Sequence, residues 1–540
     1  MALAPRTGGD WVVDALAAEG VRHVFGIPGV HNLAIYDALL RQSAVTHILA
    51  RHEQGAAFMA DGYARSSGRP GVVVVTTGPG ATNALTPLVE SYAGSQPVLA
   101  LMSDIPAALV GRDLGALHEV PNQIECFRPV TRWAERIAEG RAIAPAVQRA
   151  FALFRSARPG PVALSVPTDL LMAKTEGQLA APTGGRPACD RALVAQAAAH
   201  LARARRPLIV SGGGTVAAEA GAELIALARR LGAPVITTVM GRGAVAETDP
   251  AWLGVLPNKH ATQSALESAD VVLAVGCRFA HRSTQGLLLN LSFRPEQTLI
   301  HLDLDPRVIG ALFPPTLGIV GDARDGLAAL AAALGPGRAA AQWDTARLDA
   351  RRAARGPRWT ETDGRLIGIL REALASDAIV VNDQTGINYW MEWHFPVLAP
   401  RTFLYPVGSA VLGYAVPAAI GAKVANPKRQ VIAVAGDGGF LFSVNELATA
   451  VKYRLGIVFL VLNDQRFGAI KYLQEAMFGG RWGEADLANP DFVALARAFG
   501  AEGHRVDGLD ALPGALARAL GHAGPTLLEL PIAIDPPWEV

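Results

Sequence analysis

A glycine-rich turn between two apolar runs constrains the fold of this chain more than any other feature. The turn Gly436-Asp437-Gly438-Gly439 follows the apolar run Val431 to Ala435, which therefore predicts a buried strand ending at the turn. A second apolar run, Ile457 to Leu462, leads directly into Asn463-Asp464. Two such runs joined through a helix are typical of a strand–helix–strand unit, so this part of the chain predicts a parallel α/β sheet.

The same unit brings two acidic side chains to one edge of the predicted sheet. Asp437 and Asp464 follow neighbouring strands, and open α/β sheets bind ligands at the carboxyl ends of their strands. Ser443 and Glu446 predict a capping box for the helix between the strands, and its N-terminus would favour an anion. Carboxylates beside a phosphate cradle suit Mg²⁺. The alternative is a plain strand-to-helix turn, and the acidic residue on the next strand argues against it.

Size and composition restrict the class of protein. With 540 residues and a hydrophobic content of 50%, the chain is too long for one core and predicts three domains. A net charge of +1 with 18% charged residues gives no electrostatic reason to bind nucleic acid or an anionic membrane. The N-terminus lacks a signal-peptide core, and no apolar run reaches the ~20 residues that span a bilayer. We therefore expect a cytoplasmic protein whose three cysteines, Cys126, Cys189 and Cys277, are buried free thiols.

Two stretches rich in Pro, Gly and charged residues divide the chain, Lys174 to Arg191 and Gly335 to Gly364. We predict three doubly wound α/β domains, each around a mostly parallel sheet, over residues 1–178, 190–335 and 360–540. The middle domain is expected to be Rossmann-like, because four apolar runs there predict strands. These runs are Pro207 to Gly212, Pro234 to Thr238, Val271 to Gly276 and Thr298 to Leu304.

The turn at Gly436-Asp437-Gly438, together with Asp464, resembles the GDG…N signature of thiamine-diphosphate (ThDP) enzymes. The resemblance implies a metal held by Asp437, by the side chain of Asp464 and by the backbone carbonyl of Arg466. The family's second ligand is usually Asn, but a carboxylate at Asp464 still suits Mg²⁺. It also implies the order of the domains, which is pyrimidine-binding, middle and diphosphate-binding.

A second segment, Arg51 to Arg65, resembles the family's catalytic-glutamate motif, with Glu53 at the glutamate position. The resemblance implies that Glu53 bonds N1′ of the aminopyrimidine and so promotes the imino tautomer that removes the C2 proton. Glu53 follows the apolar stretch Val45 to Ala50 and opens an Ala-rich helix, which predicts a strand-to-helix corner. Its pKa would need to be raised, as burial beside an apolar cofactor can do.

Other segments are expected to complete the cofactor site. Thr76 to Asn83 resembles the family's loop beside the aminopyrimidine, and Leu412 matches the apolar residue that imposes the bent cofactor. Asp383 to Ile387 follows another strand, and Phe467 to Trp482 is expected to close over the substrate. The cofactor-binding residues implied in full are Gly80, Asn83, Thr385, Gly386, Ile387, Leu412, Gly436, Asp437, Gly438, Gly439, Asp464, Gly468 and Ile470.

The middle domain resembles that of acetolactate synthase, where matching segments cradle FAD. These segments are Gly212 to Gly214, Thr237 to Gly243, Gly276 to Phe279 and Asp303 to Pro306. Similar segments persist in relatives without a flavin, so the sequence leaves FAD binding open and does not favour it. Several departures argue against a synthase, among them Thr168 in place of a lysine and Leu473 in place of the tryptophan that selects the second oxo acid. Leu117-His118-Glu119 also stands where the synthase motif is usually Phe-Gln-Glu.

The remaining motifs resemble 5-guanidino-2-oxopentanoate decarboxylase more closely. They are Gly26 to His31, Arg51 to Gly55, Leu117 to Gln123 and Ile470-Lys471. His31 and His118 are candidates for proton transfer or substrate orientation, because imidazole titrates near working pH; loop histidines near the pocket are the alternative. A guanidinium substrate would also need a carboxylate, and the sequence leaves Asp113, Glu119 and Glu125 unranked.

The expected activity is ThDP- and Mg²⁺-dependent, non-oxidative decarboxylation of a 2-oxo acid through a C2-carbanion and enamine, with 5-guanidino-2-oxopentanoate giving 4-guanidinobutanal and CO₂. The alternative is a carboligase of the acetolactate synthase type. A third reading is a catalytically silent homologue, which the intact Glu53, Asp437 and Asp464 argue against. In this family one cofactor lies between two subunits, so the resemblance implies a homodimer or a dimer of dimers.

Overall fold

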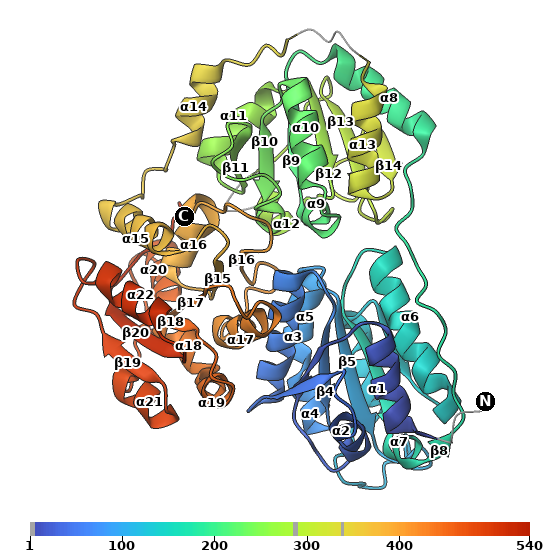
Figure 1. The fold of residues 1–540 in the computed structure, drawn as a ribbon. Helices are drawn as coiled ribbons and strands as arrows, with labels where there is room; N and C mark the ends of the chain where they lie inside the picture. Colours follow the sequence, from blue (N-terminus) through green and yellow to red (C-terminus); the bar gives the residue numbers. More distant parts are fainter. Residues whose placement is uncertain (1–5, 285–289, 336–339, 540) are drawn as a thin grey trace.

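Three parallel sheets organise the protein, as a computed structural model shows for residues 6–284, 290–335 and 340–539 (Figure 1). In Figure 1 the middle domain lies above, the N-terminal domain lies below in blue and cyan, and the C-terminal domain lies beside it in orange and red. Each sheet has six strands. The predicted fold class, three doubly wound α/β domains, is confirmed.

The N-terminal sheet has the strand order β3-β2-β4-β5-β7-β6. Alternate valines of β4 face two different cores, since Val72 and Val74 pack on one side and Val73 and Val75 on the other. Apolar residues on both faces are typical of a parallel strand covered by helices on each side. The strands are β2 (His23–Gly26), β3 (Thr46–Leu49), β4 (Gly71–Val75), β5 (Val98–Asp104), β6 (Trp133–Arg136) and β7 (Val162–Pro167). The helices are α1 (Gly8–Ala18), α2 (Leu33–Leu40), α3 (Glu53–Ser67), α4 (Pro79–Asn83), α5 (Leu85–Ala93), α6 (Ile143–Ser156) and α7 (Thr168–Met172); the short strands β1 (Arg6–Thr7) and β8 (Lys174–Thr175) pair with each other.

The middle sheet has the order β11-β10-β9-β12-β13-β14, which is the Rossmann order and confirms the predicted Rossmann-like domain. The sequence pattern identified four of these strands and missed β11 and β14. The strands are β9 (Pro207–Ser211), β10 (Val235–Thr238), β11 (Trp252–Leu256), β12 (Val271–Val275), β13 (Thr298–Asp303) and β14 (Leu317–Val320). The helices are α8 (Arg191–Arg203), α9 (Gly213–Ala217), α10 (Gly221–Leu231), α11 (Lys259–Ser268), α12 (His281–Thr284) and α13 (Ala323–Ala333).

The C-terminal sheet has the order β16-β15-β17-β18-β20-β19. Numbered within its own domain, each strand has a counterpart at the same place in the N-terminal sheet, so the two outer domains share one topology. The strands are β15 (Ile379–Asn382), β16 (Phe403–Leu404), β17 (Val431–Gly436), β18 (Val458–Asn463), β19 (Glu502–Arg505) and β20 (Thr526–Pro531). The helices are α14 (Thr345–Arg352), which precedes the domain, α15 (Glu361–Ala373), α16 (Gly386–His394), α17 (Ala415–Ala425), α18 (Asp437–Leu441), α19 (Leu447–Lys452), α20 (Gly468–Met477), α21 (Phe492–Phe499) and α22 (Leu512–Gly521).

Helices α3 and α17 join the two outer domains through glycine contacts. A Cβ on Gly62 would lie 2.2 Å from the Ala418 carbonyl oxygen, and a Cβ on Gly421 would lie 1.9 Å from the Met59 carbonyl oxygen. The two helix backbones therefore approach as closely as only glycine allows. One hydrophobic core includes both Val73 of β4 and residues of β17, so the outer domains pack as a single body.

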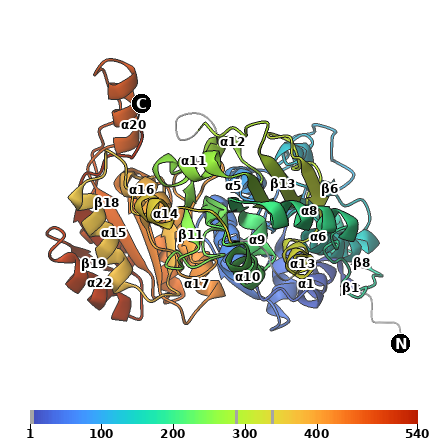
Figure 2. The same cartoon turned by 90° about the horizontal axis from the view of Figure 1, so that it is seen from above.

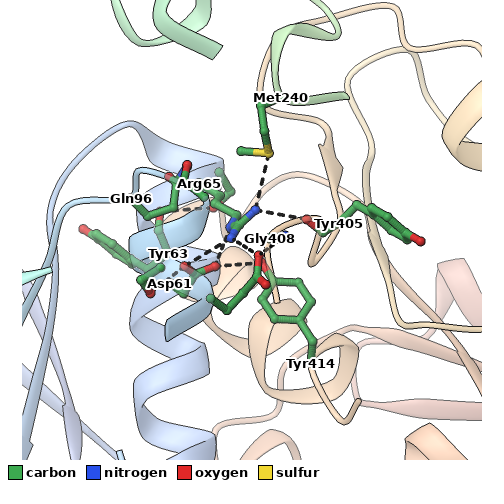
Figure 3. A network of polar contacts seen from close by, with 12 residues as sticks. Asp61, Tyr63, Arg65, Gln96, Met240, Tyr405, Gly408 and Tyr414 are labelled. Atoms are coloured by element: carbon green, nitrogen blue, oxygen red, sulfur yellow. Dashed lines mark hydrogen bonds and ion pairs between the residues drawn. The ribbon is translucent and has the colours of Figure 1, made fainter. Parts of the chain in front are cut away.

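A buried polar network closes the junction of all three domains (Figure 3). Arg65 of α3 donates to Asp61 at 2.5 Å, to Glu90 at 2.9 Å and to the Tyr405 carbonyl at 3.0 Å. Its guanidinium also contacts the Met240 sulfur of the middle domain at 3.6 Å. Because the cation is paired with two carboxylates, its burial is compensated.

Two local expectations are wrong. Ser443 and Glu446 form no capping box: α18 begins earlier, at Asp437, and the Ser443 hydroxyl donates to the Gly413 carbonyl instead. Cys189 and Cys277 are buried, but Cys126 is exposed, because the 3₁₀ turn Gln123–Cys126 turns Gln123 and Ile124 inward. No helix within the described ranges is long and apolar enough to cross a membrane.

Candidate active site

The two acidic residues of the glycine-rich turn lie together at the carboxyl edge of the C-terminal sheet. Asp437 is the first residue of α18 and is 1% exposed, and Asp464 directly follows β18. Burial raises the pKa of both carboxyls, and the charge of Asp437 raises the pKa of Asp464 further. A buried carboxylate and a partly buried one that repel each other favour a bound cation.

The structure adds two neighbours to this pair. The Arg466 guanidinium donates to Asp464 Oδ2 at 2.9 Å, so a cation would compete with this side chain. Asn489 donates to Asp437 Oδ2 at 2.6 Å and to the Asn463 side chain at 3.1 Å. Sequence reasoning missed Asn489, because it lies in a loop before α21 with no motif around it.

No group of three or more His, Cys, Asp or Glu residues across the described ranges could hold a metal by itself. Asp437 and Asp464 would therefore need further oxygen ligands, such as the Arg466 carbonyl and a phosphate. This donor set fits Mg²⁺, which is usually bound by one or two carboxylates together with substrate phosphates and water.

Glycines around the pair are closely packed, because a side chain would not fit at these positions. A Cβ on Gly436 would lie 2.7 Å from Thr385 Oγ1, and one on Gly438 would lie 2.5 Å from the Phe467 ring. Gly439 and Gly468 are restricted in the same way, by Asp383 at 2.8 Å and by Asp464 at 2.9 Å. A cradle lined by backbone N–H groups suits a diphosphate.

The other predicted cofactor residues flank this cradle. Gly386 begins α16, whose N-cap Thr385 makes no side-chain capping bond. The Ile387 side chain is fully buried in the core, so only its backbone could contact a ligand. Asp383 accepts bonds from the N–H groups of Gly413 at 3.2 Å and Ala415 at 2.9 Å; the half-buried Leu412 lies just before this held turn. Ile470 of α20 is 52% exposed, and Figure 2 shows α20 projecting from the body.

The N-terminal sheet carries a second constellation at the same edge. Glu53 is the first residue of α3, after β3, which is the predicted corner. Asn83 donates to Glu53 Oε2 at 3.0 Å, and a Cβ on Gly80 would lie 3.5 Å from Glu53 Oε1. His52 caps α3 by accepting a bond from the Gln54 N–H at 3.1 Å. The structure therefore brings Glu53, Gly80 and Asn83 together.

His31 and His118 are neighbours, with ring centroids 5.3 Å apart and ring planes tilted by 41°. Burial lowers the pKa of His31, and His118 acts in the same direction while Asp104 opposes it. The Nδ1 atoms of both rings are buried and have no hydrogen-bond partner among the residues that the structure describes. Unpaired buried imidazole nitrogens are available to a ligand.

Gln123 holds the loop between these histidines and Gly80. Its Oε1 accepts bonds from the Thr77 hydroxyl and from the Gly78 N–H, both at 2.7 Å. A Cβ on Gly78 would lie 2.4 Å from the His118 carbonyl oxygen, so the two loops touch. Sequence reasoning quoted Gln123 only as part of a motif and assigned it no role.

The three carboxylates proposed for a cationic substrate differ in their partners. Glu125 is exposed and bonds Arg128 at 2.7 Å, and Asp113 is exposed. Glu119 accepts a bond from the Ala116 N–H at 2.8 Å, and its other carboxylate oxygen is buried with no partner in the described part of the chain. Glu119 is the one of the three with a buried free acceptor.

A separate cavity of about 580 Å³ lies where the three domains meet. The segments that resemble a flavin cradle line it, including Gly213, Gly276 and Asp303. Burial and the charges of Arg278 and Arg132 lower the pKa of Arg158 in the same cavity to about 10. Clustered guanidinium groups of this kind favour an anionic ligand.

Comparison with known proteins gives three consecutive family matches. They are the N-terminal TPP binding domain, the central domain and the C-terminal TPP binding domain of thiamine pyrophosphate enzymes, over residues 6–126, 194–330 and 383–530.

Curated relatives match over almost the whole chain. A probable 2-ketoarginine decarboxylase AruI of Pseudomonas aeruginosa is 39% identical, covering 97% of this chain and 94% of the relative. A probable acetolactate synthase large subunit of Methanocaldococcus jannaschii is 36% identical over 98% and 92%. An acetolactate synthase isozyme 2 large subunit of Escherichia coli is 34% identical over 97% and 95%. The chain therefore belongs to the thiamine pyrophosphate enzyme family.

Proposed function

We propose that this enzyme decarboxylates a 2-oxo acid, and that its substrate is 5-guanidino-2-oxopentanoate, also called 2-ketoarginine. This proposal rests on the pair His31 and His118, whose buried Nδ1 atoms have no hydrogen-bond partner among the described residues. The loops of both histidines contact the segment Thr76 to Gly80, which packs against Glu53. Synthases have a glutamine in place of His118. The 39% identity to a probable 2-ketoarginine decarboxylase supports the same substrate.

The residues of the C-terminal edge would hold the cofactor. Asp437, Asp464 and the Arg466 carbonyl would bind Mg²⁺, and the bare backbone around Gly436 and Gly438 would receive the diphosphate. Once bound, ThDP supplies an electron sink for the electron pair that stays on the substrate when CO₂ departs. Thr385, Gly386 and Ile387 would add backbone contacts, and Leu412 would support the bent cofactor.

The residues of the N-terminal edge would manage protons. Glu53, kept in place by Asn83, would hold a proton at the aminopyrimidine ring. His31 has a pKa below its usual value, so it is neutral at working pH and can exchange a proton with the substrate. Glu119 would offer its free oxygen to a guanidinium group. The synthase motif shares this glutamate, so Glu119 alone would not select the substrate.

A carboligase of the acetolactate synthase type is the second candidate, because two of the relatives above are acetolactate synthase subunits. The two activities differ in their product, since a decarboxylase releases an aldehyde and a carboligase forms a new C–C bond. Leu473 in place of the synthase tryptophan favours the decarboxylase.

Product analysis separates the candidates. Purified protein with ThDP and Mg²⁺ would be offered 5-guanidino-2-oxopentanoate and pyruvate together. We expect 4-guanidinobutanal and CO₂ with pyruvate left intact. Acetolactate or a mixed ligation product would contradict the proposal and support the carboligase. Visible absorbance of the same preparation tests for FAD, which is outside the proposal.

We also propose a homodimer, or a dimer of dimers, in which each cofactor contacts both chains. Large apolar side chains are exposed near the edges of both outer sheets. At the N-terminal edge they are Val30, Leu33, Leu114 and Leu117; at the C-terminal edge they are Phe442, Ile470, Met477, Phe478 and Trp482. Such patches mark interaction surfaces. Sedimentation analysis tests this, and a monomer in the presence of cofactor would contradict it. We further propose that the enzyme is cytoplasmic and binds neither nucleic acid nor membranes.

A further inference from the structure

Glu446 of the C-terminal domain is buried directly beneath the corner that carries Glu53. It is 0% exposed. Its Oε1 accepts bonds from the N–H groups of Arg51 at 3.1 Å and His52 at 3.0 Å, and its Oε2 lies 3.2 Å from the Arg51 nitrogen. These two amides are the last before Glu53, the first residue of α3. A side chain from one domain therefore ties down the backbone that begins a helix of another.

The packing leaves space for this carboxylate because residue 55 has no side chain. A Cβ on Gly55 would lie 2.2 Å from Glu446 Oε1 and 2.6 Å from its carboxyl carbon. The first turn of α3 thus rests on the Glu446 carboxylate. The close contact between α3 and α17 holds the same two domains together further along α3.

The Glu446 carboxylate accepts hydrogen bonds but forms no ion pair with a Lys or Arg side chain in the described part of the chain. The Thr449 hydroxyl donates to Oε2 at 2.7 Å, and the Asn445 amide lies 3.4 Å from Oε1. The charge that faces it is that of Arg51, whose side chain is exposed. Burial raises the pKa of Glu446 to about 7, and these neighbours oppose that rise. A buried carboxylate with so little compensation destabilises a fold.

We infer that Glu446 is a positioning residue for Glu53. By binding the Arg51 and His52 amides, its carboxylate fixes where α3 begins, and so fixes the Glu53 carboxylate against Asn83 and Gly80. Carboxylate bonds to N–H groups are stronger than those of a neutral amide, which is why a charge is kept there despite its cost to stability. The inference rests on the proposed role of Glu53 in the cofactor chemistry.

Glu446→Gln tests the inference, because it keeps the shape and removes the charge. In the protein without cofactor, hydrogen exchange at the Arg51 and His52 amides should rise about tenfold as the corner opens more often. With ThDP and Mg²⁺, exchange of the cofactor C2 proton should slow about tenfold, since Glu53 is misplaced. ThDP affinity should stay unchanged. Thermal stability should not fall, because the replaced charge is itself destabilising.

Tyr453→Phe is the matched control. Tyr453 accepts a bond from the Leu49 N–H at 2.8 Å, so it also joins the two domains, but it does not contact the Arg51 and His52 amides. We expect its C2 exchange to stay within about twofold of wild type.

A second variant, Gly55→Ala, would push the Glu446 carboxylate away from the Arg51 and His52 amides without changing charge. It should slow C2 exchange as Glu446→Gln does.

Three results would overturn the inference. They are wild-type amide exchange in Glu446→Gln, wild-type C2 exchange in that variant, and equal slowing in Tyr453→Phe, which would make Glu446 ordinary interdomain packing. If the proposed function is wrong, the outcome is different: exchange of the cofactor C2 proton would be slow in the wild-type protein or unaffected by Glu53→Gln. The amide measurement needs no cofactor and still tests the inference in that case.

Discussion

The two outer sheets share one strand order, yet their carboxyl edges carry different chemistry. In the N-terminal sheet the edge holds Glu53, the imidazoles of His31 and His118, and the carboxylates of Asp104 and Glu119. In the C-terminal sheet it holds the buried carboxylates of Asp383 and Asp437 and the partly buried carboxylate of Asp464, beside glycines. The shared topology therefore supplies a place for a ligand, and the residues at each edge determine the chemistry of that place.

The two edges also differ in what they lack. The N-terminal edge has no cluster of carboxylates for a cation among its described residues, and the C-terminal edge has no imidazole beside Asp437. We propose that each edge is half of a site, the N-terminal edge for proton transfer and the C-terminal edge for the metal and diphosphate.

The largest effect is expected at the N-terminal edge. Glu53→Gln should lower kcat by about 10³-fold, because it removes the proton-handling carboxyl. ThDP affinity should change little, since the diphosphate is held by the other edge. Steady-state kinetics with calorimetric titration of ThDP checks both parts. Wild-type turnover in this variant would remove Glu53 from the mechanism.

The mirror-image change is Asp437→Asn at the C-terminal edge. It should weaken ThDP–Mg²⁺ binding by about 100-fold while kcat at saturating cofactor falls less, because a metal ligand is lost and the proton-handling group is not. Titration of Mg²⁺ at fixed ThDP measures the loss. A variant with normal cofactor affinity and low kcat would break the division between the two edges.

Glu446 lies where the two domains meet, and its pH dependence sharpens the comparison. Its pKa rises from 4.5 to about 7 on folding. The folded state binds the Glu446 proton more tightly than the unfolded chain does. This contribution to the free energy of unfolding is fully present below pH 4.5 and is lost as the pH rises through about 7. Glu446→Gln should therefore be more stable than wild type by about 2 kcal/mol near pH 8, with the gap closing toward pH 4.5. Urea unfolding without cofactor, repeated across this range, measures the gap. A constant gap would show that the charge is not its cause.

The smallest effect is expected from Asp464→Asn, which introduces the residue usual in the family. It removes the repulsion with Asp437 and the ion pair with Arg466. Mg²⁺ affinity should fall by less than about fivefold and kcat should be retained, because an amide oxygen can still bind the metal. Metal titration of the variant checks this. A complete loss of binding would mean that the second carboxylate is essential in this chain.

The fold and the site motifs were largely predictable because their signals are local. Apolar runs ending at Gly436 and at Asp464 defined two strands and their shared edge, and Glu53 was placed correctly at a strand-to-helix corner. The sequence does not indicate the middle strands β11 and β14, because a glycine interrupts the apolar run of each, Gly254 in β11 and Gly318 in β14.

What could not be predicted depends on contacts between distant segments. Asn489 donates to Asp437 from the loop between α20 and α21. Glu446 was read as half of a capping box, a local pattern, whereas its carboxylate bonds amides almost 400 positions away in the chain. The packing of the N-terminal domain against the C-terminal domain brings those groups together.

The central claim is that two half-sites from different chains act on one cofactor. It is tested most directly by combining Glu53→Gln and Asp437→Asn subunits, each with its own affinity tag, and assaying the purified heterodimer. If each site combines the N-terminal edge of one subunit with the C-terminal edge of the other, one site of the heterodimer carries both substitutions and the other carries neither. We therefore expect about half of the wild-type activity. Activity no higher than that of the two parent variants would contradict the account and place each site within a single chain.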